Sequence, residues 1–101
     1  MIVSVIYQLQ AGQTFDLDYY MKTHIPMVQK LFGPIGFRGV QVLEGVGSPS
    51  GPAPARVIAL LDFESADAFK KAIDTHGAAV MGDIANFTQC QPSIQFNEVL
   101  T

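Results

Sequence analysis

Hydrophobic and polar residues follow two different periods along this chain, and these periods predict four strands and two helices. Four short runs rich in β-branched and aromatic residues are typical of strands and cover residues 2–9, 35–47, 55–63 and 93–100. Two longer segments repeat their apolar positions every three or four residues, as amphipathic helices do, and cover residues 16–32 and 66–76. The predicted order of elements is therefore βαββαβ.

Capping residues and a glycine support the helix boundaries. Thr14 or Asp16 can cap the first helix and Ser65 the second, because their side-chain oxygens accept hydrogen bonds from free backbone N–H groups. Gly77 is expected to end the second helix. The residues that follow, 78–87, predict a further helical turn or two.

Pro26 interrupts the apolar pattern of the first helix two residues after His24. A proline inside a helix cannot bond the carbonyl of Lys22, and it disfavours helical geometry at Ile25. We therefore expect a kink or a short break directly after His24. Pro26 can equally begin a second short helix, because proline is tolerated in the first helical turn, and the two interpretations can coexist.

The βαββαβ order predicts an α+β, ferredoxin-like fold with a four-stranded antiparallel sheet and both helices on one face. We expect residues 1–101 to form a single domain of this kind. The first and third strands should be central, because they are apolar on both faces, whereas the second and fourth strands mix in polar residues. Two helices can cover only one face of such a sheet.

The uncovered face of this sheet predicts a partner, because soluble proteins rarely expose large apolar patches. The simplest partner is a second copy of the chain, packed face to face into a dimeric α/β barrel. Candidate contributors to this homodimer interface are Val40, Val42, Ile94 and Phe96.

Composition and charge exclude several classes of protein. Of the 101 residues, 49% are hydrophobic and 15% are charged, which is typical of a globular chain rather than a disordered one. The formal net charge of −3 and the scattered basic residues predict binding neither to nucleic acid nor to an anionic membrane. Cys90 is the only cysteine and no long apolar run is present, so we expect a cytoplasmic protein without disulfide, secretion signal or membrane span.

His24 is the main candidate for chemistry, because it lies in the middle of the apolar face of the first predicted helix. A buried imidazole needs hydrogen-bond partners and titrates near neutral pH, which suits a general acid or base. Tyr20 lies one turn earlier on the same face, where its hydroxyl could orient the imidazole or a substrate oxygen. The alternative is a structural histidine, whose ring is bonded to a backbone carbonyl or to a tyrosine.

Four further residues are candidates for contacting a substrate. His76 lies on the apolar face of the second helix, although its place beside Gly77 also fits a structural role at a helix C-terminus. Tyr7, Phe37 and Phe63 lie on predicted strands and could wall a pocket for a flat apolar ligand, or simply fill the core. Two histidines without a ligand spacing predict no metal site.

Three segments of the chain resemble a known family. The first reads Phe15-Asp16-x-x-Tyr19-Tyr20-x-x-x-His24-x-Pro26, the second runs from Asp83 to Thr88, and the third is Gln95-x-x-Glu98-Val99. Together they resemble the EthD family, which is named for ethyl tert-butyl ether degradation and belongs to the dimeric α/β-barrel superfamily. The first segment, with its aromatic pair and His-x-Pro, is the most specific of the three.

The resemblance implies a homodimer of ferredoxin-like subunits, each with a cavity between sheet and helices for a small hydrophobic ligand. It also implies a bacterial catabolic setting and an oxidoreductase role in the breakdown of ethers or aromatic compounds. Haem-degrading members of the superfamily carry a tryptophan in their sites. This chain has no tryptophan, so we do not expect haem, which would need His24 or His76 on an open side. Other members of the superfamily act without any cofactor, and we expect none here.

Three functions remain open on this evidence. The first is a cofactor-independent oxidoreductase, lyase or isomerase, in which His24 moves a proton on a small, largely apolar or aromatic substrate. The second is a non-catalytic accessory protein that binds such a compound for a separate oxygenase. The third is a purely structural dimer with a filled core. The acid/base residue on an apolar face favours a pocket, but it does not distinguish turnover from binding.

Overall fold

The computed structural model describes residues 1–101, and its elements follow the predicted βαββαβ order. The strands are β1 (Ile2–Tyr7), β2 (Phe37–Glu44), β3 (Val57–Phe63) and β4 (Ser93–Asn97). The helical elements are α1 (Leu17–Tyr19), a π-helical turn η1 (Tyr20–His24), α2 (Ile25–Phe32), α3 (Ala66–Gly82) and a 3₁₀ turn η2 (Ile84–Asn86). The elements α1, η1 and α2 follow one another directly and together correspond to the first predicted helix.

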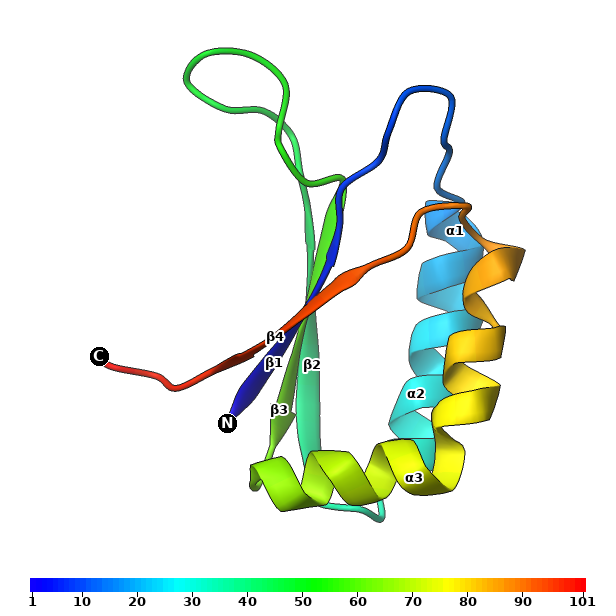
Figure 1. Cartoon of the computed structure of the whole chain (residues 1–101), viewed down its shortest axis with the longest axis vertical. Helices are drawn as coiled ribbons and strands as arrows, with labels where there is room; N and C mark the ends of the chain where they lie inside the picture. The colour runs from blue at the N-terminus through cyan, green and yellow to red at the C-terminus, as the bar shows by residue number, and fades with distance from the viewer.

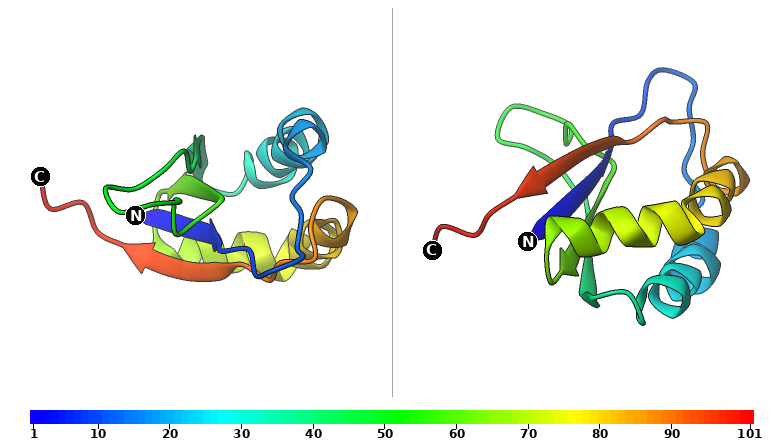
Figure 2. Two further views of the ribbon diagram at one scale, coloured as in Figure 1. Left: turned by 90° about the horizontal axis from the view of Figure 1, so that it is seen from above. Right: turned by 60° about the horizontal axis from the view of Figure 1, so that its bottom comes forward.

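The strands form one antiparallel sheet in the order β2-β3-β1-β4. β1 and β3 are therefore central, as their two-sided apolar pattern predicts. The helices gather on one side of this sheet and leave its other face without a helix (Figures 1 and 2). The α+β, ferredoxin-like fold expected from the sequence is confirmed.

The strand register corrects one expectation about the sheet. The four residues expected on the uncovered face lie on the helix-facing side instead: Val40, Val42, Ile94 and Phe96. Their cross-strand partners on β1 and β3 belong to the core or pack against it. In β2, a bulge between Phe37 and Gly39 changes the alternation of side chains, which the sequence pattern alone does not reveal.

The face without helices, called the free face below, is formed by the strand residues that alternate with the helix-facing ones. Ile58 of β3 pairs with Ile6 of β1 and with Leu43 of β2, and Leu60 pairs with Ser4. Leu43 is 40% exposed, and the three other apolar side chains are half-buried. An apolar strip therefore runs across the middle of the sheet with no element of this chain on it.

The core lies between the sheet and the helices and consists of two clusters of buried residues. One cluster contains Phe32 of α2 and Phe63 of β3. The other contains Tyr7 of β1, Tyr20 of η1 and Phe87, which follows η2. The second cluster borders the candidate site.

Both predicted helix caps are present. The Asp16 carboxylate accepts a hydrogen bond from the backbone N–H of Tyr19 at 3.0 Å, and the Ser65 hydroxyl accepts one from that of Ala68 at 3.1 Å. A side-chain cap of this kind stabilises a protein by about 1 kcal/mol. The capping residues therefore define where each helical segment begins.

The helix irregularity near Pro26 ends at His24 instead of following it. In η1 the N–H of Ile25 bonds the carbonyl of Tyr20, five residues earlier, which widens the turn. Pro26 follows in the first turn of α2, so its interpretation as the start of a second short helix is confirmed. The expected kink directly after His24 is not seen, because a widened turn accommodates the proline ring that a regular helix would not.

The second helix, α3, continues through Gly77, so the expectation that Gly77 ends it is wrong. Gly77 is buried, and a Cβ atom there would lie 3.0 Å from Cγ2 of Ile73. The missing side chain allows close packing within a continuing helix rather than a cap. The helix also bends in the segment coloured yellow in Figure 1, so that its C-terminal part runs alongside α2.

Candidate functional site

His24 ends the π-helical turn, and its side chain is buried between the helices and the sheet. Only 4% of the residue is exposed. Its ring stacks on that of Tyr20, with centroids 5.4 Å apart and planes 17° apart, and its centroid lies 4.7 Å from that of Phe87. Two aromatic rings therefore hold the imidazole in one orientation.

The imidazole bonds to the carboxylate of Asp83, with Nδ1 2.9 Å from Oδ2. The other oxygen of this carboxylate accepts hydrogen bonds from the Tyr19 hydroxyl at 2.7 Å and from the Asn86 amide at 2.9 Å. These four side chains form the His24–Asp83 network. The partner of the His24 ring is therefore a carboxylate. It is neither the backbone carbonyl nor the tyrosine expected for a purely structural histidine.

The charge of Asp83 determines which nitrogen of His24 carries a proton. Burial alone would raise the pKa of Asp83, but the hydrogen bonds from Tyr19, Asn86 and His24 outweigh it and lower the pKa below its usual value of 3.8. The carboxylate is therefore ionised at neutral pH and can only accept hydrogen bonds. Nδ1 must be the donor, which leaves Nε2 of the neutral ring as the nitrogen that can accept a proton.

Contacts between two distant segments bring the carboxylate to the imidazole. The backbone N–H of Asp16 bonds the carbonyl of Phe87 at 2.8 Å, and the Thr88 hydroxyl donates to the carbonyl of Thr14 at 2.7 Å. Phe15 and Thr88 also form an isolated β-bridge. The segment after α3 is thus tied to the start of the first helical segment.

A cavity opens beside the imidazole, between the sheet and the helices. Its volume is about 50 Å³, and 14 of its 16 lining residues are hydrophobic. Roughly four water-sized groups fit into such a volume, so a larger ligand requires lining side chains to move. Among the lining residues, His24 alone carries an imidazole, a side chain that can act as a general acid or base.

The structure brings some of the predicted substrate-binding residues to this cavity and not others. Tyr7 and Tyr20 line it together with His24. Phe37 and Phe63 do not line it, because their rings, with centroids 5.4 Å apart, pack in the other core cluster.

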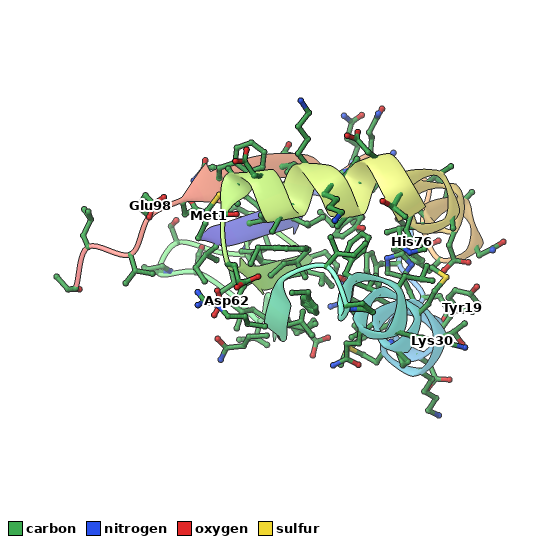
Figure 3. The ribbon with its side chains drawn as sticks, turned by 90° about the horizontal axis from the view of Figure 1, so that it is seen from below. Met1, Tyr19, Lys30, Asp62, His76 and Glu98 are labelled. Atoms are coloured by element: carbon green, nitrogen blue, oxygen red, sulfur yellow. The ribbon has the colours of Figure 1, made fainter.

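His76 is also outside the cavity lining. It is half-buried on the side of α3 that faces α2 (Figure 3). Since α3 continues to Gly82, His76 lies inside the helix, and the expected role at a helix C-terminus does not apply.

Sequence reasoning missed three members of the network, Asp83, Tyr19 and Asn86. A signal was present, because all three fall within the segments that resemble the EthD family. Their connection was not visible, since Asp83 is 59 positions from His24 and reaches it only because α3 bends back along α2.

Neither a metal cluster nor a membrane-spanning helix occurs in this chain. No three His, Cys, Asp or Glu side chains lie close enough together to hold a metal ion. No helix is both long and apolar enough to cross a membrane. Cys90 is buried and its thiol donates to the carbonyl of Gln8 at 3.3 Å, which supports a structural role.

Asp83→Asn should reduce the acid sensitivity of the protein. The folded-state pKa of Asp83 is lower than its unfolded value, so its carboxylate contributes stability that is fully present above about pH 4 and is lost as pH falls through the folded-state pKa. We therefore expect the free energy of unfolding, measured in urea at several pH values, to fall less steeply below pH 4 in the variant. The surface variant Asp74→Asn is the control, and equal slopes for Asp83→Asn and wild type would contradict the prediction.

The segments that form this site match the model of a known protein family. The model of the EthD domain matches residues 12–90, a range that contains the whole His24–Asp83 network. No curated protein sequence matches the chain.

Several solved structures share the fold. An EthD-like protein from Ralstonia eutropha is 32% identical, with a TM-score of 0.91 over 99% of this chain and 91% of that one. An EthD family protein from Bacillus halodurans is 18% identical, with a TM-score of 0.62 over 96% of each chain. A dimeric ferredoxin-like protein from an uncultured marine organism is 10% identical, with a TM-score of 0.54 over 100% of both chains.

Proposed function

Because this chain belongs to the EthD domain family, we propose that it binds a small, largely apolar or aromatic compound and moves a proton on it at His24. One observation carries the proposal. The imidazole lines an apolar cavity, while its Nδ1 is held 2.9 Å from an ionised carboxylate. In this proposal Nε2, the ring nitrogen not engaged by Asp83, is the proton acceptor at the cavity.

The His24–Asp83 network suits general acid–base catalysis. When Nε2 takes a proton from a ligand, the ring becomes an imidazolium, and the adjacent Asp83 carboxylate stabilises its charge. A positioned base of this type contributes about 10²–10⁴-fold to a reaction rate. The same group returns the proton in a later step, which fits an isomerase, a lyase or one stage of an oxidoreductase.

The ionised partner favours turnover over simple binding. A site that only holds an apolar compound gains nothing from a largely enclosed carboxylate behind its histidine, because taking a charge out of water is unfavourable unless it is paired. The accessory role, in which the compound is only bound for a separate oxygenase, is therefore the second candidate. It would be recognised by ligand binding without any proton transfer.

We also propose that two copies associate through their free faces. The apolar strip around Ile58 supports this, because an uncovered apolar sheet face is unfavourable in water. The protein from an uncultured marine organism that shares this fold is described as a dimeric ferredoxin-like protein. Association would complete the dimeric α/β barrel and leave each cavity between its own sheet and helices.

The binding part of the proposal can be tested by filling the cavity. Ile84 lines the cavity and its neighbour Ala85 does not, so Ile84→Trp should block it while Ala85→Trp should not. We expect calorimetric titration with phenol and with cyclohexanone to detect binding to wild type and to Ala85→Trp, and at least tenfold weaker binding to Ile84→Trp. Absence of binding to the wild type, or equal binding to all three proteins, would contradict a ligand site here.

A further inference from the structure

Two tyrosine hydroxyls at the cavity are not part of the His24–Asp83 network. Tyr7 and Tyr20 are each only 1% exposed, and no hydrogen bond to another residue acts on either hydroxyl. Every fully enclosed side-chain oxygen in the protein has a partner, so these two oxygens must border open space. Both residues line the cavity, and we place their two hydroxyls at its wall.

Both hydroxyls keep their protons at physiological pH. Burial, and to a smaller extent the neighbouring Tyr20 and Cys90, raises the pKa of Tyr7 far above its usual range, and burial does the same for Tyr20. A neutral phenol in apolar surroundings without an acceptor is unfavourable. The two tyrosines are therefore donors for an acceptor that enters the cavity.

The three polar groups at the cavity differ in what they offer. Tyr7 and Tyr20 donate hydrogen bonds, whereas Nε2 of His24 accepts a proton. A complementary ligand carries an acceptor oxygen and, close to it, an acidic hydrogen. Carboxylates fit poorly, because the lining is mostly hydrophobic and Asp83 is already negative. A neutral ketone or aldehyde with a hydrogen on its α-carbon meets both requirements.

We infer that the ligand class is an enolisable carbonyl compound, whose oxygen is bound by the hydroxyls of Tyr7 and Tyr20 and whose α-proton is removed by His24. This inference rests on the proposed function and specifies its substrate. The α C–H bond breaks and its proton bonds Nε2, while the C–H electron pair forms a carbon–carbon double bond. The carbonyl π pair moves to oxygen, and the two hydroxyls stabilise the resulting enolate as an oxyanion hole does.

The step needs no oxidant, because protons and electrons balance within the site. In D₂O, the proton on Nε2 is replaced by a solvent deuteron, and return of that deuteron to the same carbon gives exchange. Delivery to the γ-carbon of a β,γ-unsaturated ketone gives isomerisation. Charge is conserved throughout, since the enolate and the imidazolium appear and disappear together.

The test is hydrogen–deuterium exchange at the α-carbon of cyclohexanone and of 2-tetralone in D₂O, followed by proton NMR. We expect wild-type protein to accelerate exchange over buffer, and Tyr7→Phe and Tyr20→Phe each to lower that acceleration by about 10²-fold. Both substitutions keep the ring that packs in the core. The control Thr75→Val removes a surface hydroxyl on α3 and should exchange like wild type.

The outcomes separate this inference from the proposed function. Exchange that is absent, or that survives in both tyrosine variants, overturns the enolisable-carbonyl assignment. If cyclohexanone still binds and Ile84→Trp still blocks it, the ligand site stands and only the substrate class fails. If neither phenol nor cyclohexanone binds the wild type, both proposals fail together.

Discussion

Ile58→Asp is expected to convert a dimer into a monomer. Ile58 lies in the middle of the free face, between Ile6 and Leu43, and is only partly buried within one chain. A carboxylate there is tolerated in an isolated subunit, which leaves that face in water. Between two sheets it would be desolvated without a partner, at a cost of several kcal/mol, so the dissociation constant should rise by about 10³-fold or more.

Sedimentation equilibrium of wild type and variant at several concentrations measures this effect. Ala79→Asp places the same charge on an exposed position of α3 and should leave the dimer intact. Circular dichroism shows whether the Ile58→Asp subunit remains folded. A wild-type protein that stays monomeric at all concentrations would refute the proposed association, as would an Ile58→Asp protein that dimerises normally.

His24→Asn should lower any proton transfer at the site by about 10²–10⁴-fold while leaving the fold in place. Asparagine is of similar size and can still donate a hydrogen bond towards Asp83, but it cannot take up a proton near neutral pH. Tyr19 and Asn86 also continue to bond the carboxylate. We therefore expect a melting temperature close to that of wild type and nearly unchanged binding of cyclohexanone.

The comparison of stability and exchange rate distinguishes the possible roles of His24. If His24→Asn loses about 1–3 kcal/mol of stability while exchange and binding persist, the histidine is a structural residue. If wild type and variant both bind the ketone and neither promotes exchange, His24 moves no proton on this compound, and the ligand site is the part of the proposal that stands. Asp83→Asn serves as the matched variant, because it keeps the imidazole and removes the charge that stabilises its protonated form.

Much of the fold could be predicted because its signals are local. Residues 57–63 carry apolar side chains on both faces of the strand, which identified it as central, and the structure places it at the centre of the sheet. Asp16 and Ser65 marked the starts of the helical segments, since a cap depends on residues only three positions apart. The position of His24 within an apolar stripe likewise followed from helical periodicity.

Other features depend on which distant residues meet. A glycine can end a helix or allow close packing within one, and the residue type alone does not distinguish the two. At Gly77 the close approach of Ile73 identifies the second case. The register of β4 against β1 decides that Phe96 faces α3, where its ring centroid lies 5.4 Å from that of Phe69. The alternation of residues along a strand shows that the strand has two faces, but it does not show which of these faces the helices cover.

The sequence by itself determined the elements, their order and the place of His24 on an apolar helix face, because hydrogen bonding and hydrophobic periodicity act over a few neighbouring residues. The tertiary structure decided what that histidine can do. It joined His24 to Asp83 across 59 positions, assigned the proton to Nδ1, and left the hydroxyls of Tyr7 and Tyr20 unpaired at one apolar cavity. These properties arise from burial and from groups brought together by folding, and no local pattern encodes either.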